Sequence, residues 1–252
     1  MIDLRQGDCL ELMKNIPDKS IDMILCDLPY GTTTCKWDVI ISFEPLWEQY
    51  NRIIKDNGAI VLFGKQPFTT DLIMSNRKLF KYELIWEKDK PTNFALANKQ
   101  PMCYHENILV FYKKQPIYNK QLIKREGSGS SRCEYGVNHK NRTIHGTNKK
   151  YTSKKEKDNY DKEFKNPKSI LYYDTGRRQD LYHPTQKPVA LLEYLIKTYT
   201  NESETVLDNC MGSGSTGVAC KKLNRNFIGI ELDENYYKIA CERINNTQEK
   251  VS

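Results

Sequence analysis

The stretch TVLDNCMGSGSTGVACKKLNRNFIGIE, residues 205–231, decides the fold class. It begins with a short apolar run, continues through a glycine-rich turn into a helical segment, and ends in a second apolar run with Glu231 at its tip. Gly212, Gly214 and Gly217 form a G-x-G-x-x-G pattern, which permits a tight turn and lets a ligand approach the backbone closely. This order of strand, glycine turn, helix, strand and acid is typical of an adenosine-binding unit.

The unit leaves the choice of cofactor open. NAD, FAD and S-adenosylmethionine all contain adenosine, and a carboxylate at Glu231 suits the ribose hydroxyls of each. Asp208, which precedes the glycines, would repel a pyrophosphate but attract a sulfonium or an ammonium group. A glycine turn that only lets a helix pack on a strand is the simpler alternative.

Apolar runs elsewhere in the chain predict the rest of an α/β fold. Candidate strands cover residues 21–26, 59–63, 84–86, 108–112, 205–207 and 227–230. Residues 42–55 and the stretches that follow Thr185 and Asp233 have helical spacing, with these two residues as N-caps. Short apolar strands alternating with amphipathic helices favour an open, mostly parallel sheet that is covered on both faces. In such sheets ligands bind beyond the carboxyl ends of the strands.

Length and composition exclude several classes of protein. A chain of 252 residues suits one large domain, or one domain with an insertion. No apolar stretch approaches 18 residues, and the first residues lack the layout of a signal peptide. The eight cysteines are scattered without a C-x-x-C pair, as expected for free thiols in a reducing cytosol. We therefore expect a cytoplasmic protein with no membrane span and no metal site.

The positive charge is concentrated in one segment. Residues 113–180 contain 18 basic and 8 acidic side chains, a net charge of +10, whereas the remainder contains 21 and 24, a net charge of −3. The same segment has few apolar residues, but seven aromatic side chains lie among its cations. Two interpretations stay open: a solvated surface insertion, or a nucleic-acid interface in which cations neutralise phosphates and aromatic rings stack on bases.

The strand expected at residues 21–26 ends in Asp27, Leu28, Pro29 and Tyr30. A carboxylate at a strand tip can accept a hydrogen bond from an amino group. Pro29 favours an extended backbone at Leu28 and so directs the carbonyl group of that residue. The ring of Tyr30 offers a stacking face. These groups suit the capture of an exocyclic amine on a planar base, although an ordinary Asp-x-Pro turn would look the same.

Several motifs, taken together and in order, resemble those of the DNA amino-methyltransferases that place the catalytic motif before the cofactor motif (the beta class). They are DLPY at 27–30, DNCMGSGSTG at 208–217, HPTQKP at 183–188, HENILVFYK at 105–113 and GDCLELM at 7–13. The family pattern has the first proline of a Pro-Pro pair where this chain has Leu28, and Pro-Phe where it has Asn209 and Cys210. Leucine keeps the main-chain carbonyl group, so we expect activity, with a rate that the looser backbone could lower.

The resemblance implies an α/β fold: a Rossmann-like sheet of the S-adenosylmethionine-dependent methyltransferases with an inserted basic target-recognition region. Residues 1–112 and 183–252 would form the catalytic domain, and residues 113–182 the target-recognition insertion. The implied partner is double-stranded DNA, and the class adds a homodimer and a cognate restriction endonuclease as expectations.

The resemblance also assigns roles to residues. The catalytic residues would be Asp27, Leu28, Pro29 and Tyr30, which hold a flipped base by its amino group and by stacking. The cofactor S-adenosylmethionine would be bound by Asp8, Cys9, Asp27, Thr185, Lys187, Asp208, Asn209, Cys210, Gly212, Ser213, Gly214, Ser215, Glu231 and Leu232. DNA would be bound by Lys149, Lys150, Lys154, Lys155, Arg177 and Arg178. Aspartate in the first catalytic position usually accompanies N6-adenine as the target.

Four alternatives stay open at this point. Transfer to N4 of cytosine would use the same site. A DNA-binding module with a decayed active site would account for Leu28. An RNA methyltransferase would share the cations and the aromatic rings. A nicotinamide-dependent oxidoreductase would use the glycine turn and Glu231 but gives no role to Asp27 or to the basic segment.

Overall fold

The computed structural model describes residues 1–31, 39–125, 163–176, 182 and 186–248. The chain divides into two compact units, one formed by residues 1–119 and 168–252 and the other by residues 120–167. In the smaller unit, β6 (Ile123–Lys124) pairs with β7 (Phe164–Lys165) in antiparallel orientation.

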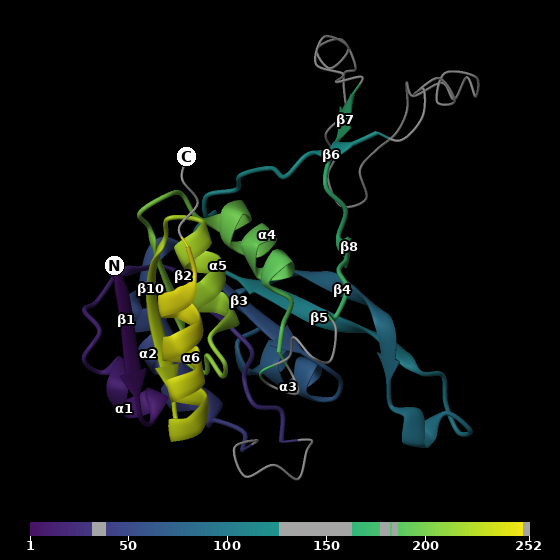
Figure 1. Cartoon of the computed structure of the whole chain (residues 1–252), viewed down its shortest axis with the longest axis horizontal. Helices are drawn as coiled ribbons and strands as arrows, with labels where there is room; N and C mark the ends of the chain where they lie inside the picture. The colour runs from purple at the N-terminus through teal and green to yellow at the C-terminus, as the bar shows by residue number, and fades with distance from the viewer. Residues whose placement is uncertain (32–38, 126–162, 177–181, 183–185, 249–252) are drawn as a thin grey trace. The chain divides into compact units, whose positions relative to one another are not determined.

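An eight-stranded sheet organises the larger unit. Figure 1 shows this sheet with helices packed against it. Its strands are β1 (Ile2–Gln6), β2 (Ile21–Cys26), β3 (Ile54–Gly64), β4 (Phe80–Thr92), β5 (Cys103–Phe111), β8 (Ile170–Tyr172), β9 (Thr205–Asp208) and β10 (Asn226–Glu231). The spatial order is β1-β10-β9-β2-β3-β5-β4-β8. The first five run parallel, and β5 is antiparallel to both of its neighbours. This confirms the predicted α/β fold with a mostly parallel sheet.

Helices cover both faces of the sheet. One core contains residues of α1 (Cys9–Met13), α2 (Phe43–Ile53) and α3 (Phe68–Ser75). The other contains residues of α4 (Val189–Tyr199), α5 (Ser215–Lys222) and α6 (Glu234–Asn246). A short 3-10 helix, Phe94–Leu96, lies in the connection between β4 and β5. In the part of the chain that the structure describes, no helix is long and apolar enough to cross a membrane.

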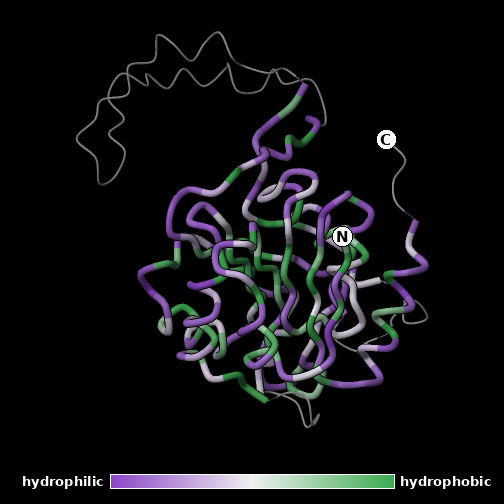
Figure 2. Tube along the Cα trace, turned by 90° about the vertical axis from the view of Figure 1, so that its left-hand side faces the viewer, coloured by the Kyte–Doolittle hydropathy of each residue, from purple (hydrophilic) through white to green (hydrophobic). Residues whose placement is uncertain are grey.

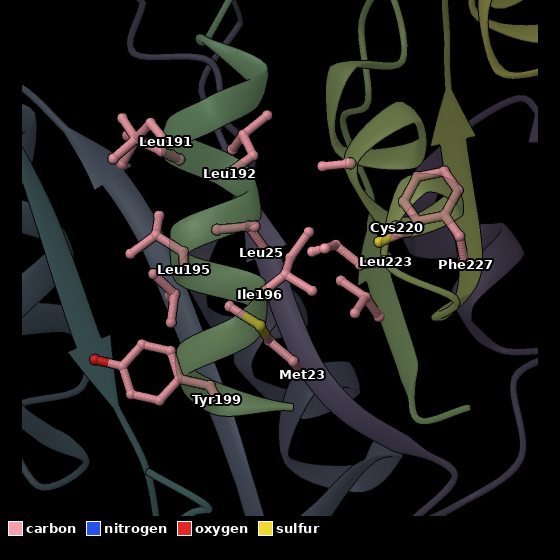
Figure 3. Packing of buried hydrophobic residues seen from close by; sticks show 14 of the residues in the cluster. Met23, Leu25, Leu191, Leu192, Leu195, Ile196, Tyr199, Cys220, Leu223 and Phe227 are labelled. Carbon is pink, nitrogen blue, oxygen red and sulfur yellow. The ribbon is translucent and has the colours of Figure 1, made fainter. Parts of the chain in front are cut away.

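The two cores arise from alternation along the buried strands. In β2, Met23 and Leu25 join the core beneath α4, α5 and α6, whereas Ile24 and Cys26 join the opposite core. Successive side chains of a strand point to opposite faces, so a strand buried on both faces must be apolar throughout. Figure 2 shows the hydrophobic residues along the central strands, and Figure 3 shows Leu192, Leu195 and Ile196 of α4 beside Met23 and Leu25.

The structure corrects several predicted boundaries. All six predicted strands are present, but β3, β4 and β5 extend well beyond the predicted ranges, and β1, β6, β7 and β8 were not predicted. Strand β1 lacks an apolar run because it carries Asp3 and Arg5. Their side chains form an ion pair, with 2.7 Å between Arg5 Nη2 and Asp3 Oδ2. Residues 168–176, which fall within the predicted recognition segment 113–182, contribute β8 to the sheet through pairing with β4.

Two helix starts were predicted from capping residues, with different outcomes. Asp233 caps α6 as predicted, because its carboxylate accepts hydrogen bonds from the backbone N–H groups of Asn235 and Tyr236. The prediction of Thr185 as the cap of α4 is wrong, since the N-cap position is held by Pro188 with φ −61°. Proline lacks the N–H that a helix start leaves unpaired, and its φ angle is compatible with entry into a helix.

Candidate active site

The sheet topology brings the two predicted motifs together. Strands β2 and β9 are parallel neighbours, with Ile24 opposite Leu207. The chain leaves β2 towards β3 on one side and leaves β9 towards β10 on the other. Such a reversal of strand order opens a crevice beyond the carboxyl ends of the two strands, where α/β proteins bind ligands. Asp27 follows β2 directly and Asp208 ends β9, so both carboxyl groups lie at this crevice.

A cavity of about 510 Å³ occupies the crevice. Its volume lies within the range that is usual for small-molecule sites. The predicted site residues that line it are Asp8, Cys9, Asp27, Leu28, Pro29, Tyr30, Lys187, Asp208, Asn209, Cys210, Gly212, Ser213, Ser215, Glu231 and Leu232. The structure therefore gathers around one cavity residues that are spread over more than 200 positions of the sequence.

Other predicted site residues lie elsewhere. Gly214 is absent from the cavity lining and faces α6. The predicted cofactor residue Thr185 falls outside the described residues. So do all of the predicted DNA-binding side chains: Lys149, Lys150, Lys154, Lys155, Arg177 and Arg178.

Tyr30 and Asp27 are joined by a hydrogen bond. The Tyr30 hydroxyl donates to Asp27 Oδ1 at 2.6 Å, and burial raises the pKa of Tyr30 well above its ordinary value, so the hydroxyl stays a donor. The Tyr30 ring lies 4.9 Å from the ring of Phe68, centroid to centroid, at an interplanar angle of 30°. This contact holds the aromatic ring at the wall of the cavity beside the carboxylate.

A cluster of buried charges adjoins Asp27. Lys187, which precedes α4, donates a hydrogen bond to Asp27 Oδ2, and its Nζ lies 3.3 Å from Glu106 Oε2. Glu106, on β5, accepts a hydrogen bond from Lys88 of β4 at Oε1. Burial raises the pKa of Asp27, and the Lys187 ammonium opposes that effect. Burial acts in the same direction on Glu106, but there the Lys187 and Lys88 ammonium groups outweigh it and lower the pKa.

Asp208 is a buried carboxyl group that spans the glycine turn. Its Oδ1 accepts from the backbone N–H of Cys210 at 3.2 Å, and its Oδ2 accepts from the Thr216 hydroxyl at 2.6 Å. Burial raises the pKa of Asp208 to about 7, although both hydrogen bonds favour the ionised form. Near neutral pH this group therefore exchanges readily between its charged and neutral forms.

The first two glycines of the turn serve different purposes. Gly212 has φ +52°, and a Cβ built on it would meet nothing within 4 Å, so this position faces the open cavity. Gly214 has φ +80°, and a Cβ there would lie 2.9 Å from Ala240 Cβ on α6. Both conformations disfavour L side chains. Gly214 lets the turn pack closely against α6, which is the purely structural role considered for the glycines. Gly212 instead leaves room for a ligand.

Two further acidic residues that line the cavity are held by the backbone. Glu231, at the tip of β10, accepts hydrogen bonds from the N–H groups of Gly212 at 2.8 Å and Asp233 at 2.9 Å. Burial raises its pKa. Asp8 caps α1 by accepting from the N–H groups of Leu10 and Glu11 with one oxygen. Both side chains are thereby oriented before any ligand arrives.

Sequence reasoning missed several residues of the site. Glu106 carries a signal that was overlooked, namely an acidic residue just before the apolar end of a strand. Tyr50 of α2 donates to Asn209 Oδ1 at 2.5 Å, which accounts for the asparagine at that position. Ser213 donates to Gln186 Oε1 at 3.1 Å and accepts from Arg243 at 2.8 Å. These contacts join distant segments, so no local pattern points to them.

Comparison with known proteins places the chain in a family. The family model described as DNA methylase, for N6 and N4 methyltransferases, matches residues 21–242. The Type II methyltransferase M.HinfI of Haemophilus influenzae is 27% identical, over 95% of this chain and 67% of its own length. The DNA adenine methyltransferase YhdJ of Escherichia coli K12 is 30% identical, over 94% of this chain and 81% of its own.

Two solved structures of DNA methyltransferases resemble this chain. The structure of the M1.HpyAVI–SAM complex has a TM-score of 0.63 and 25% identity, covering 97% of this chain and 100% of that one. The cytosine-N4-specific PvuII DNA methyltransferase has a TM-score of 0.68 over 100% of this chain and 88% of its own, at 15% identity, a likeness of fold. The sheet, the cavity between β2 and β9 and the match over residues 21–242 lead to one conclusion: the chain belongs to the N6/N4 DNA methylase family.

Proposed function

We propose that this DNA methylase transfers a methyl group from S-adenosylmethionine to the N6 amino group of adenine in double-stranded DNA. The observation that carries the proposal is the position of Asp27 and Asp208 on one cavity, at the tips of neighbouring parallel strands. In this proposal one carboxyl group accepts from the amino group of a base, and the other binds a cationic cofactor. A single cavity that holds both reactants supports direct transfer without a covalent enzyme intermediate.

The residues of the glycine turn fit S-adenosylmethionine. Gly212 leaves open space where a side chain would block a ligand, and the carboxyl groups of Asp208 and Glu231 line the same cavity. In this proposal Asp208 and the turn hold the methionine end, Glu231 holds the ribose hydroxyls, and Asp8 accepts from the adenine amine. The cofactor, when bound, supplies an electrophilic methyl group on a sulfonium.

The base-binding half consists of Asp27, Leu28 and Tyr30. Tyr30 stacks on a base that has been flipped out of the duplex, at a cost of roughly a few kcal/mol. Asp27 and the carbonyl oxygen of Leu28 accept hydrogen bonds from its amino group, which orients the nitrogen lone pair towards the methyl group. Leu28 is 3% exposed, so its position at the cavity wall is held by core packing. Catalysis then rests on positioning and on electrostatics.

Two facts support adenine as the target. Asp27 holds the first catalytic position, and in this family aspartate there usually accompanies N6-adenine. The relative that is 30% identical over 94% of this chain is named as an adenine methyltransferase. Transfer to N4 of cytosine requires the same acceptors and the same stacking face, so product analysis must decide between them.

The test is identification of the methylated base. The full chain is incubated with unmethylated DNA and isotopically labelled S-adenosylmethionine, and the DNA is digested to nucleosides for mass spectrometry. Labelled N6-methyladenine is the expected product. Labelled N4-methylcytosine would overturn the choice of base and keep the mechanism. Label in RNA but not in DNA, or bound cofactor without transfer, would overturn the proposal.

The basic segment 113–182 is the proposed target-recognition region. Its support is the net charge of +10 over residues 113–180 and the aromatic residues among the cations, both suited to a nucleic acid. A homodimer and a cognate restriction endonuclease are expectations of the resemblance. Light scattering of the purified protein tests the first of these by measuring its mass in solution.

A further inference from the structure

Glu106 and Lys88 lie beside the active site, yet the proposed function gives them no role. The side chains of Lys88, Lys187 and Glu106 are 7%, 7% and 12% exposed. Glu106 spans the two lysines, with Oε1 bound to Lys88 and Oε2 lying 3.3 Å from Lys187 Nζ. Among the described residues, Glu106 Oε2 is the buried side-chain oxygen with no hydrogen-bond partner. Glu106 Oε2 therefore contacts Lys187 as an ion pair without an aligned hydrogen bond, and this arrangement of a buried carboxylate calls for an explanation.

The ammonium group of Lys187 is held by the carboxylate that the substrate would need. Lys187 donates to Asp27 Oδ2, while Tyr30 donates to Oδ1 at 2.6 Å. Both oxygens of Asp27 are thus engaged by side chains of the protein itself. A base amino group that approaches Asp27 must compete with a cation, which binds a carboxylate more strongly than a neutral donor does.

We propose that Glu106 is a positioning residue that receives the Lys187 ammonium when the target amino group engages Asp27. The inference rests on the proposed function, because it takes Asp27 as the acceptor for that amino group. Moving a buried ammonium group away from its counter-ion would be strongly unfavourable if no second carboxylate were available. Glu106 removes most of this cost, since Lys187 stays paired throughout the move. Lys88 holds the other oxygen and so keeps Oε2 turned towards Lys187.

The charges of the cluster suit this role. Burial would lower the pKa of Lys187, but Asp27 and Glu106 raise it above its ordinary value. The lowered pKa of Glu106 keeps that group ionised at neutral pH. The shift of Lys187 therefore moves a charge between two carboxylates without proton transfer. The same contact keeps Asp27 ordered until a base enters.

The experiment compares Glu106→Gln with the double variant Glu106→Gln/Lys187→Met in the full chain. In the single variant Lys187 has only Asp27 as a carboxylate partner, and we expect kcat to fall about tenfold or more. The double variant removes the competing ammonium group, so its kcat should exceed that of the single variant by about threefold or more. Rates are measured at saturating S-adenosylmethionine and DNA, so that changes in affinity do not enter kcat.

Control variants separate positioning from stability. Glu87→Gln changes an exposed glutamate on β4, opposite His105, and should leave kcat unchanged. Glu106→Asp keeps the charge and should retain more activity than Glu106→Gln, which a purely steric role would not predict. Thermal unfolding and cofactor titration verify that each variant is folded.

The Glu106 variants test the role of Glu106, and Asp27→Asn tests the proposed function separately. A wild-type kcat in Glu106→Gln, equal losses in Glu106→Gln and Glu106→Asp, or a double variant no faster than the single one would each overturn the inference. A wild-type kcat in Asp27→Asn would overturn the proposed function itself. Loss of activity in Asp27→Asn together with full activity in Glu106→Gln would overturn only the role of Glu106.

Discussion

The Thr216 hydroxyl donates a hydrogen bond of 2.6 Å to Asp208 Oδ2, linking the tip of β9 to the first turn of α5. The other oxygen of Asp208 accepts from the backbone N–H of Cys210 in the intervening turn. One carboxyl group therefore braces both sides of the glycine turn. Since the group is only 4% exposed, its ionisation is linked to folding and to the charge of any ligand in the turn.

The stability of the protein should depend on pH through Asp208. Burial raises its pKa to about 7, whereas an unfolded aspartate has a pKa of about 3.9. Between these values the folded state binds more protons than the unfolded state, so this group's contribution to stability falls as pH rises and levels off above pH 7. We expect the Tm of Asp208→Asn, relative to wild type, to rise between pH 5 and pH 8. A difference that does not change with pH would contradict this.

Cofactor binding should release protons through the same group. If the methionine ammonium group lies beside Asp208, it favours the ionised carboxylate and lowers its pKa. Binding at pH 7 should then release up to about half a proton, because a group with a pKa of about 7 is about half protonated there. Calorimetric titration in two buffers of different ionisation enthalpy measures the number. The variant Asp208→Asn should release less, and equal release in both proteins would exclude Asp208 as the source.

Replacing Asp27 should separate transfer from cofactor binding. Asp27→Ala removes the acceptor for the amino group, and we expect kcat to fall about 100-fold or more. The affinity for S-adenosylmethionine should stay largely intact, because other residues hold the cofactor. Tyr30→Phe is the matched control, since it keeps the ring and removes only the hydrogen bond to Asp27. Transfer that persists in Asp27→Ala would show that the catalytic assignment is wrong.

Alanine at the two glycines should have different effects. Gly212→Ala introduces backbone strain of about 1–2 kcal/mol at φ +52°, and it places a methyl group in the cavity, so cofactor affinity should fall. Gly214→Ala adds a clash with Ala240, and we expect about 1–3 kcal/mol of further loss in the free energy of unfolding. Urea unfolding and cofactor titration measure both. Equal loss of stability in the two variants would contradict the assignment.

If the basic segment contacts DNA, it should contribute to the salt dependence of DNA binding. Replacing Lys149, Lys150, Lys154 and Lys155 by alanine should weaken binding and reduce the slope of log K against log salt. The reduction should be about one unit for each DNA phosphate that the variant no longer neutralises. Fluorescence anisotropy at several salt concentrations measures the slope. An unchanged slope would favour the interpretation of this stretch as a solvated insertion.

Local patterns in the sequence predicted the elements on which the fold depends. The apolar run at 21–26 and the unit 205–231 predicted their strands because a strand buried on both faces must be apolar throughout. The glycine turn was recognised because the backbone conformation it requires disfavours other residues. Strands β1 and β8 were missed: one carries charges and the other has three residues, so each depends on pairing with a neighbour.

The sequence by itself therefore determined the apolar strands, the turn and the two motifs that line the cavity, because these depend on interactions between residues near one another in the chain. Only the tertiary structure placed Lys187 on Asp27, 160 residues away, and Glu106 beside both. Only the tertiary structure joined Tyr50 to Asn209, 159 residues away. A buried charge or amide is stabilised by a group that folding brings to it from a distant part of the chain. Such a pair produces no local pattern in the sequence.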